Sequence, residues 1–237
     1  MNDGSIDCVT LRLSATLLLV GQALYIMVTL LHPDGDANNH SAVFAEYATS
    51  GIWAAVHLGQ FLSMAILLAG LLALFVALDI QPARSRWASG FGAVMAVVTL
   101  ALYGILQAVD GVALKHAVDT WASAPDAEKA ARFASAEAVR WLEWGVRGYQ
   151  NFALGLALLL FGFAIMRTTS LPRPIGCLMG LSGLTCMVQG WVVGAEGFSR
   201  METIAIVLAF ALDLVWMIWL VAVAWRKQAM AVELHAR

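Results

Sequence analysis

Polar and charged side chains recur on one face of a strongly apolar stretch in the second half of the chain. Arg140, Glu143, Arg147 and Gln150 fall within an arc of about 80° when a helix advances by about 100° per residue. Charged groups in hydrocarbon are costly, and in membrane helices they almost always face other helices or water. This spacing therefore predicts a polar site inside a membrane protein.

Five further apolar segments carry comparable residues, which are Tyr25, His57 and Gln60, Gln107 and Asp110, Gln189, and Asp213. Nearly all of them lie in the same half of their segments. The opposite halves of the second, fourth and sixth segments hold no ionisable residue. We expect the polar stripes to converge on a hydrated pocket that opens to the outside and is sealed on the cytoplasmic side.

The predicted site combines a ligand-binding set with three candidate catalytic groups. The ligand-binding set is His57, Gln60, Gln107, Asp110, Glu143, Arg147, Gln150, Gln189 and Asp213. Asp213 or His57 could act as a general acid or base, and Tyr25 could stabilise a developing charge. Arg147 and Asp213 are the deepest opposite charges, and we expect them to face one cavity, paired directly or bridged by water, Gln189 or a ligand.

A second ion pair is predicted at the outer rim. A helical hairpin over 110–146 with its turn near residue 124 sets Asp110 level with Arg140 if the hairpin is symmetric. We therefore expect these two side chains to form an ion pair.

The histidines do not form a metal-binding motif. No H-x-x-x-H or H-E-x-x-H pattern occurs, and a metal site requires three or four ligands within reach. His32 borders a loop, and His116 lies on another face of its helix from Asp110. We predict no metal and no cofactor. A haem or metal would have to bind through His57, and a haem with two histidine ligands would add His32 or His116.

The composition and the apolar segments predict which helices position these residues. The chain has 237 residues, of which 61% are hydrophobic and 13% are charged, and its mean hydropathy is +0.78. Soluble domains carry about 25% charged residues, so this is a membrane protein. We predict an all-α integral membrane protein with one domain, 1–237, containing six transmembrane helices and a small extracytoplasmic helical headpiece. The spans are approximately 11–31, 52–78, 87–109, 146–166, 174–194 and 203–225, with the hairpin 110–146 and a helical start to the second span near 41–50.

The distribution of basic residues predicts the orientation. With the N-terminus inside, the cytoplasmic side holds Arg12, Arg84, Arg86, Arg167, Arg173, Arg226, Lys227 and Arg237. The first apolar segment has no cleavage site, so we expect it to be retained. We predict a multi-pass protein of the cell (inner) membrane with both termini cytoplasmic.

Glycines indicate close helix packing in the fifth span. Gly176 and Gly180, and again Gly190 and Gly194, are four residues apart, a spacing that lets membrane helices approach closely. We expect this helix to be central and tightly packed.

These observations favour a protein that binds a small or amphipathic, possibly anionic ligand in an outward-facing pocket. One alternative is an intramembrane enzyme, an acid/base isomerase, cyclase or hydrolase of a lipid-like substrate. The others are a small-solute transporter and an accessory subunit of a membrane complex. The predicted partners are membrane lipid and a small-molecule ligand, and a homo-oligomer or a membrane-complex partner is left open. The net charge of −2 argues against nucleic acid as a partner.

Overall fold

The computed structural model describes residues 7–33, 36–78 and 83–235, and within 83–235 it describes the side chains of 86–227. The regular secondary structure of the described residues is helical. The elements are α1 (Cys8–Thr29), α2 (His40–Thr49), α3 (Trp53–Ala77), α4 (Ala83–Gln107), the π-helix η1 (Ala108–Leu114), α5 (Lys115–Ala122), α6 (Asp126–Arg167), α7 (Arg173–Glu196) and α8 (Arg200–His235).

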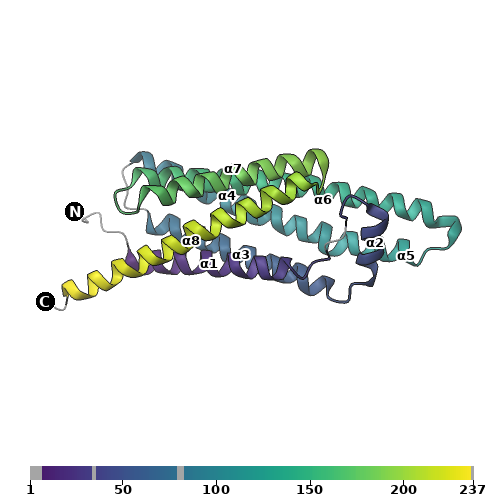
Figure 1. Cartoon of the computed structure of the whole chain (residues 1–237), viewed down its shortest axis with the longest axis horizontal. Coiled ribbons are helices and arrows are strands. Elements are labelled where there is room, and N and C mark those ends of the chain that lie inside the picture. Colours follow the sequence, from purple (N-terminus) through teal and green to yellow (C-terminus); the bar gives the residue numbers. More distant parts are fainter. Residues whose placement is uncertain (1–6, 34–35, 79–82, 236–237) are drawn as a thin grey trace.

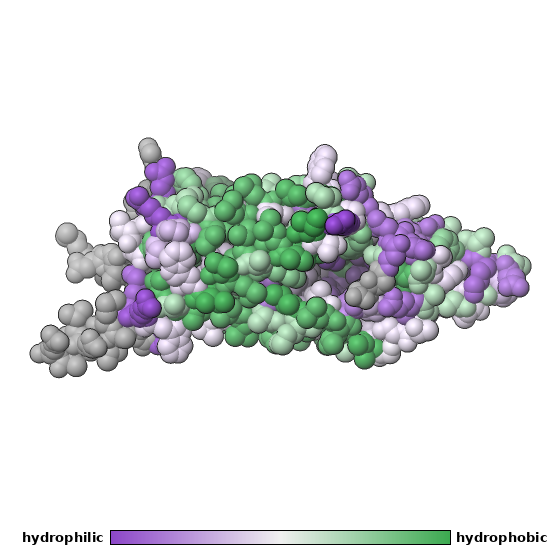
Figure 2. Space-filling model, in the orientation of Figure 1, coloured by the Kyte–Doolittle hydropathy of each residue, from purple (hydrophilic) through white to green (hydrophobic). Residues whose placement is uncertain are grey.

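Six helical segments are long and apolar enough to cross a membrane. They are Cys8–Thr29, Trp53–Ala77, Arg86–Ala122, Asp126–Arg167, Arg173–Glu196 and Arg200–Lys227. Figure 2 shows a broad hydrophobic band across the middle of the face in view and hydrophilic residues toward both ends. The predicted all-α membrane bundle is confirmed, and the protein is a multi-pass membrane protein.

The headpiece lies at the end of the bundle opposite the two chain termini (Figure 1). It is built from α2, α5 and the first turns of α6, which pack around a small apolar core of Val43, Phe44, Tyr47, Trp53, Leu114, Val118 and Ala136. Helix α5 ends at Ala122 and α6 begins at Asp126, so the hairpin turns where the sequence predicted. The segment near 41–50 is a separate helix and not the start of the second span, because Ser50 is extended and Gly51 follows it.

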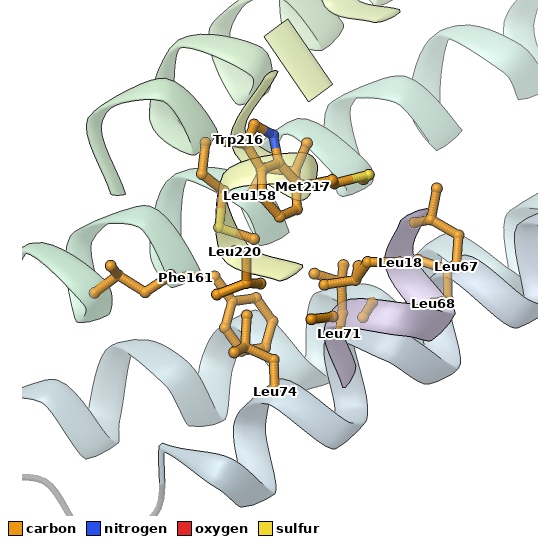
Figure 3. Packing of buried hydrophobic residues seen from close by; sticks show 14 of the residues in the cluster. Leu18, Leu67, Leu68, Leu71, Leu74, Leu158, Phe161, Trp216, Met217 and Leu220 are labelled. Carbon is orange, nitrogen blue, oxygen red and sulfur yellow. The ribbon is translucent and has the colours of Figure 1, made fainter. Parts of the chain in front are cut away.

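The half of the bundle nearer the termini is filled by apolar side chains. Figure 3 shows residues of α1, α3, α6 and α8 pointing toward one another, among them Leu18, Leu71, Phe161 and Trp216. All four side chains are fully buried. This packing leaves the polar residues to gather in the half nearer the headpiece.

Helices α6 and α7 meet through glycines spaced by seven residues. Gly148 faces Gly190, Gly155 faces Gly183, and Gly162 faces Gly176 in antiparallel register. The predicted spacing of four holds at Gly176 and Gly180, because a Cβ on Gly162 would lie 2.6 Å from the Gly176 carbonyl oxygen and 2.9 Å from the Gly180 nitrogen. It is wrong at Gly194, where a Cβ would meet nothing within 4 Å.

The position expected for α7 also needs correction. Helix α7 packs tightly on α6 and α8, but it is not central. Leu181, Leu184, Val188 and Trp191 on its outer face are exposed.

Candidate functional site

The π-helix η1 positions the first acidic residue of the site. π-Helical turns are rare, and they are frequently found at functional sites. The wider turn directs Asp110 inward, where it is buried, and it leaves the Gly111 carbonyl to accept a hydrogen bond from Trp53 Nε1 at 3.0 Å. Gly111 also permits close approach of α3, because a Cβ there would lie 2.9 Å from the His57 Cβ. The π-helix and this glycine together bring Asp110 beside His57.

His57, Asp110 and His32 form one cluster. His57 Nε2 lies 3.2 Å from Asp110 Oδ2, and one candidate ligand atom from each of the three residues lies within 4.8 Å of the other two. The two imidazole rings are 5.3 Å apart at an angle of 64°. His32, expected to border a loop and considered as one of two possible second histidine ligands, therefore lies beside His57, the residue on which a metal site would depend. Burial lowers the pKa of His32, which favours its neutral form.

Arg140 and Glu143 form a separate buried ion pair. Arg140 Nη1 donates to Glu143 Oε2 at 2.6 Å, and the two side chains are only 2% and 1% exposed. The predicted Asp110–Arg140 pair is not formed, and no ion pair within 4.0 Å joins these two among the described residues. The hairpin turns near residue 124 as predicted, but each of the two residues has a nearer partner. The π-helix η1 directs Asp110 toward His57 on α3, and Glu143 follows Arg140 by one helical turn.

The pocket nearest the headpiece, called here the outer pocket, has a volume of about 320 Å³. Its lining residues are Thr29, His32, Pro33, Asp36, Ala37, Tyr47, Gln60, Asp110, Arg140, Glu143, Arg147, Phe198, Glu202 and Thr203. Burial raises the pKa of Tyr47, so its phenol stays protonated.

Two loops meet at the outer pocket. Asn38 donates to the Glu196 carbonyl at 3.0 Å and accepts from the Phe198 amide at 2.9 Å. The Phe198 ring, held in place by this contact, lies 4.6 Å from the Arg140 guanidinium and 5.0 Å from that of Arg147. Two cations therefore share one aromatic ring at the pocket wall.

A smaller pocket lies deeper and is called the inner cavity; its volume is about 60 Å³. It is lined by polar residues from five helices, Gln22, Tyr25, Thr29, Tyr103, Arg147, Gln150, Asn151, Gln189 and Asp213, together with apolar residues and Cys186. Thr29 and Arg147 line both pockets. The predicted single pocket is thus two adjoining spaces, with Arg147 at their boundary.

Arg147 and Asp213 face the inner cavity together, but each has its own surroundings. Asp213 accepts a hydrogen bond from Trp216 Nε1 at 2.9 Å, and Gln189 donates to Glu202 at 3.2 Å. Among the described residues, Arg147 has no carboxylate within 4.0 Å. The direct form of the expected Arg147–Asp213 pair is therefore absent, while the shared cavity is present.

The remaining predicted residues divide among three places. Tyr25, Gln150 and Gln189 line the inner cavity, and Gln60 lines the outer pocket, where its amide is 3.4 Å from the Thr29 hydroxyl. Gln107 lies elsewhere, in a groove between α3 and α4 that His57 also lines. Gln107 precedes Asp110 by three positions and lies about 60° from it around a helix, so a small rotation directs it into this groove.

Several lining residues were missing from the predicted site. Gln22 lies three positions before Tyr25 on the polar stripe that the spacing predicts for the first span, although the predicted ligand-binding set did not include it. Asn151 is four positions after Arg147, about 40° from it around the helix, so it continues the same stripe and could have been found from the spacing. Glu202 lies in the first turn of α8, and only the tertiary contact with Gln189 shows that it faces the site.

Comparisons with known proteins place the chain in one family. A search of curated proteins and a search of solved structures each found no match. The model of the family described as Domain of unknown function (DUF4386) matches residues 11–224, which include four of the six membrane-spanning helices in full, all but three residues of each of the other two, and both pockets. The chain therefore belongs to the DUF4386 family of membrane proteins.

Proposed function

We propose that this protein binds a small, amphipathic ligand through an anionic group, with Arg147 as the principal contact. The observation that carries the proposal is the position of Arg147, at the boundary of both pockets and without a carboxylate within 4.0 Å among the described residues. An arginine in a membrane helix needs a partner, because an unpaired charge there is costly. A carboxylate or phosphate group supplies that partner and fits the planar guanidinium.

The inner cavity supports an anion by its supply of hydrogen-bond donors. The amide nitrogens of Gln22, Gln150 and Asn151 are buried there and have no hydrogen-bond partner. Its volume of about 60 Å³ suits a small anionic group, and the outer pocket, at about 320 Å³ and lined mainly by polar and charged side chains, suits a further polar part of the ligand. The head group of a membrane lipid or of a related amphiphile combines an anionic group with further polar atoms.

The test measures thermal unfolding of the detergent-purified protein with octyl phosphate, octanoate and uncharged octanol. We expect the two anions to raise the melting temperature of the wild type and octanol to leave it unchanged. Arg147→Gln should abolish the shift, and Arg147→Lys should retain part of it because the charge remains. The matched control is Arg132→Gln on the exposed headpiece surface, where Arg132 pairs with Glu128 at 2.9 Å, and it should respond as the wild type does.

Two results would overturn the proposal. One is an equal shift in Arg147→Gln and in the wild type. The other is the absence of a shift with either anion, together with native mass spectra in which no small molecule remains bound to the wild type.

We further propose that the pockets open away from the cytoplasm, in the cell (inner) membrane, with both termini cytoplasmic. The excess of Lys and Arg at the end that holds the termini supports this orientation. In a cysteine-free variant, a new cysteine at the exposed Ala127 should react with an impermeant maleimide added to intact cells. A cysteine at the exposed Thr169 should react only after lysis, and the reverse pattern would show the opposite orientation.

A further inference from the structure

We propose that His32, His57 and Asp110 form a binding site for a divalent transition-metal ion, with Zn²⁺ as the reference ion. Two imidazoles and one carboxylate are a common ligand set for Zn²⁺ and for related first-row ions. The three ligands are distinct from the inner-cavity residues proposed to bind the anion, although His32 and Asp110 share the outer pocket with Arg147.

The hydrogen bonds of the two imidazoles leave the correct nitrogen free. His57 Nδ1 lies 2.9 Å from the Trp53 carbonyl oxygen, and His32 Nδ1 lies 2.8 Å from the Pro33 carbonyl oxygen. A carbonyl only accepts, so each Nδ1 carries a proton, and in the neutral imidazole Nε2 then keeps its lone pair. Metal-binding histidines in proteins are oriented in the same way by a backbone carbonyl on the other nitrogen.

The separation of the donor atoms fits a metal. With metal–ligand distances of about 2.0–2.1 Å and tetrahedral angles, two ligand atoms lie ~3.3 Å apart. His57 Nε2 and Asp110 Oδ2 are 3.2 Å apart. The His32 donor lies within 4.8 Å of both.

The main rival is a plain ion pair between a protonated His57 and Asp110. Such a pair would be stabilised by an N–H aimed at the carboxylate. The 3.2 Å between His57 Nε2 and Asp110 Oδ2 fits such a pair as well as a shared metal, but the pair leaves Asp110 Oδ1 without a hydrogen-bond partner. The third donor, His32, would add a second imidazole that the ion pair does not use.

A metal ion could reach these ligands through the outer pocket. One of its coordination positions would remain open toward that pocket. His32 and Asp110 line the outer pocket, which also contains the acidic residues Asp36, Glu143 and Glu202. Zinc sites that bind water or substrate have this arrangement, with three protein ligands and a fourth position that faces a polar pocket. The metal would therefore present one position to whatever occupies the outer pocket.

The experiment measures metal content and metal affinity in the full-length protein, purified through a tag without histidine and without chelators. We expect about one Zn²⁺ per chain by elemental mass spectrometry. After removal of the metal, Co²⁺ should bind with one-to-one stoichiometry and give d–d absorption bands. His32→Ala and Asp110→Asn should each weaken Co²⁺ binding at least ~100-fold, since loss of an outer hydrogen bond alone costs ~10–100-fold.

The matched control is His40→Ala. His40 pairs with Glu137 at 2.9 Å in the headpiece, so it is another histidine–carboxylate pair, but it belongs to no cluster of three ligands among the described residues. This variant should bind Co²⁺ as the wild type does. The partly exposed His32 provides the decisive variant if the substitution of buried Asp110 prevents folding.

The proposal is overturned if the metal-free wild type binds neither Zn²⁺ nor Co²⁺ stoichiometrically. It is also overturned if His32→Ala and His40→Ala bind Co²⁺ equally well, since metal binding would then lie elsewhere. An ion pair between His57 and Asp110 predicts the first of these results.

Discussion

The contact between α6 and α7 depends on glycine, and substitution of Gly183 by alanine tests it. A Cβ on Gly183 would lie 2.5 Å from the Gly155 carbonyl oxygen and 3.0 Å from the Leu159 backbone nitrogen. An ordinary contact begins at 3.4 Å, so the helices would have to separate locally by 3.4 − 2.5 = 0.9 Å. Neither contact is with a flexible side-chain end, so the backbone must move. Overpacking of this kind costs about 1–3 kcal/mol, and we expect Gly183→Ala to lower the free energy of unfolding by about 2 kcal/mol.

Gly155→Ala provides a second measurement of the same contact. Its Cβ would lie 2.5 Å from the Gly183 carbonyl oxygen, which is the reciprocal overlap. One helix displacement relieves both overlaps. The double substitution should therefore cost clearly less than the sum of the two single ones.

The assay is unfolding in mixed micelles with increasing dodecyl sulfate, followed by circular dichroism. The control is Gly194→Ala on the same helix, where a Cβ would meet nothing within 4 Å. Alanine has the higher helix propensity, so this variant should be unchanged or more stable by up to ~1 kcal/mol. If Gly183→Ala and Gly194→Ala unfold with the same free energy, the glycine contact does not determine how closely α6 and α7 pack.

Three further substitutions test individual polar contacts by the same unfolding assay. Asp213→Asn retains an acceptor for the Trp216 N–H and should change stability by less than ~1 kcal/mol, whereas Asp213→Ala should cost ~1–3 kcal/mol; equal losses would contradict this account. Glu143→Ala leaves the Arg140 charge buried and should cost ~3–5 kcal/mol. The double change Arg140→Met with Glu143→Leu should recover most of this loss, and a Glu143→Ala variant as stable as the wild type would show that the pair has no structural role. Asn38→Ala removes two hydrogen bonds between the outer loops and should cost ~1–2 kcal/mol, and an unchanged stability would show that water replaces them.

The sequence by itself determined the spans and the character of their faces. A membrane helix must satisfy its backbone internally and present about 20 apolar residues to lipid, so hydropathy alone counts six spans. Helical periodicity and the turn-forming residues predicted the helical hairpin with its turn near residue 124. Periodicity also placed Arg147 and Asp213 on inward faces, because a charge on a lipid face is too costly.

Only the tertiary structure decided which residues meet. Asp110 pairs with His57 and not with Arg140 because η1 widens one turn, and no sequence pattern marks that change. His32 reaches the same cluster only because α1 ends beside α3. Secondary structure follows from contacts a few residues apart along the chain, whereas these pairings depend on the register between helices. That register is set by packing between distant segments, and a shift of one residue rotates a side chain by about 100°.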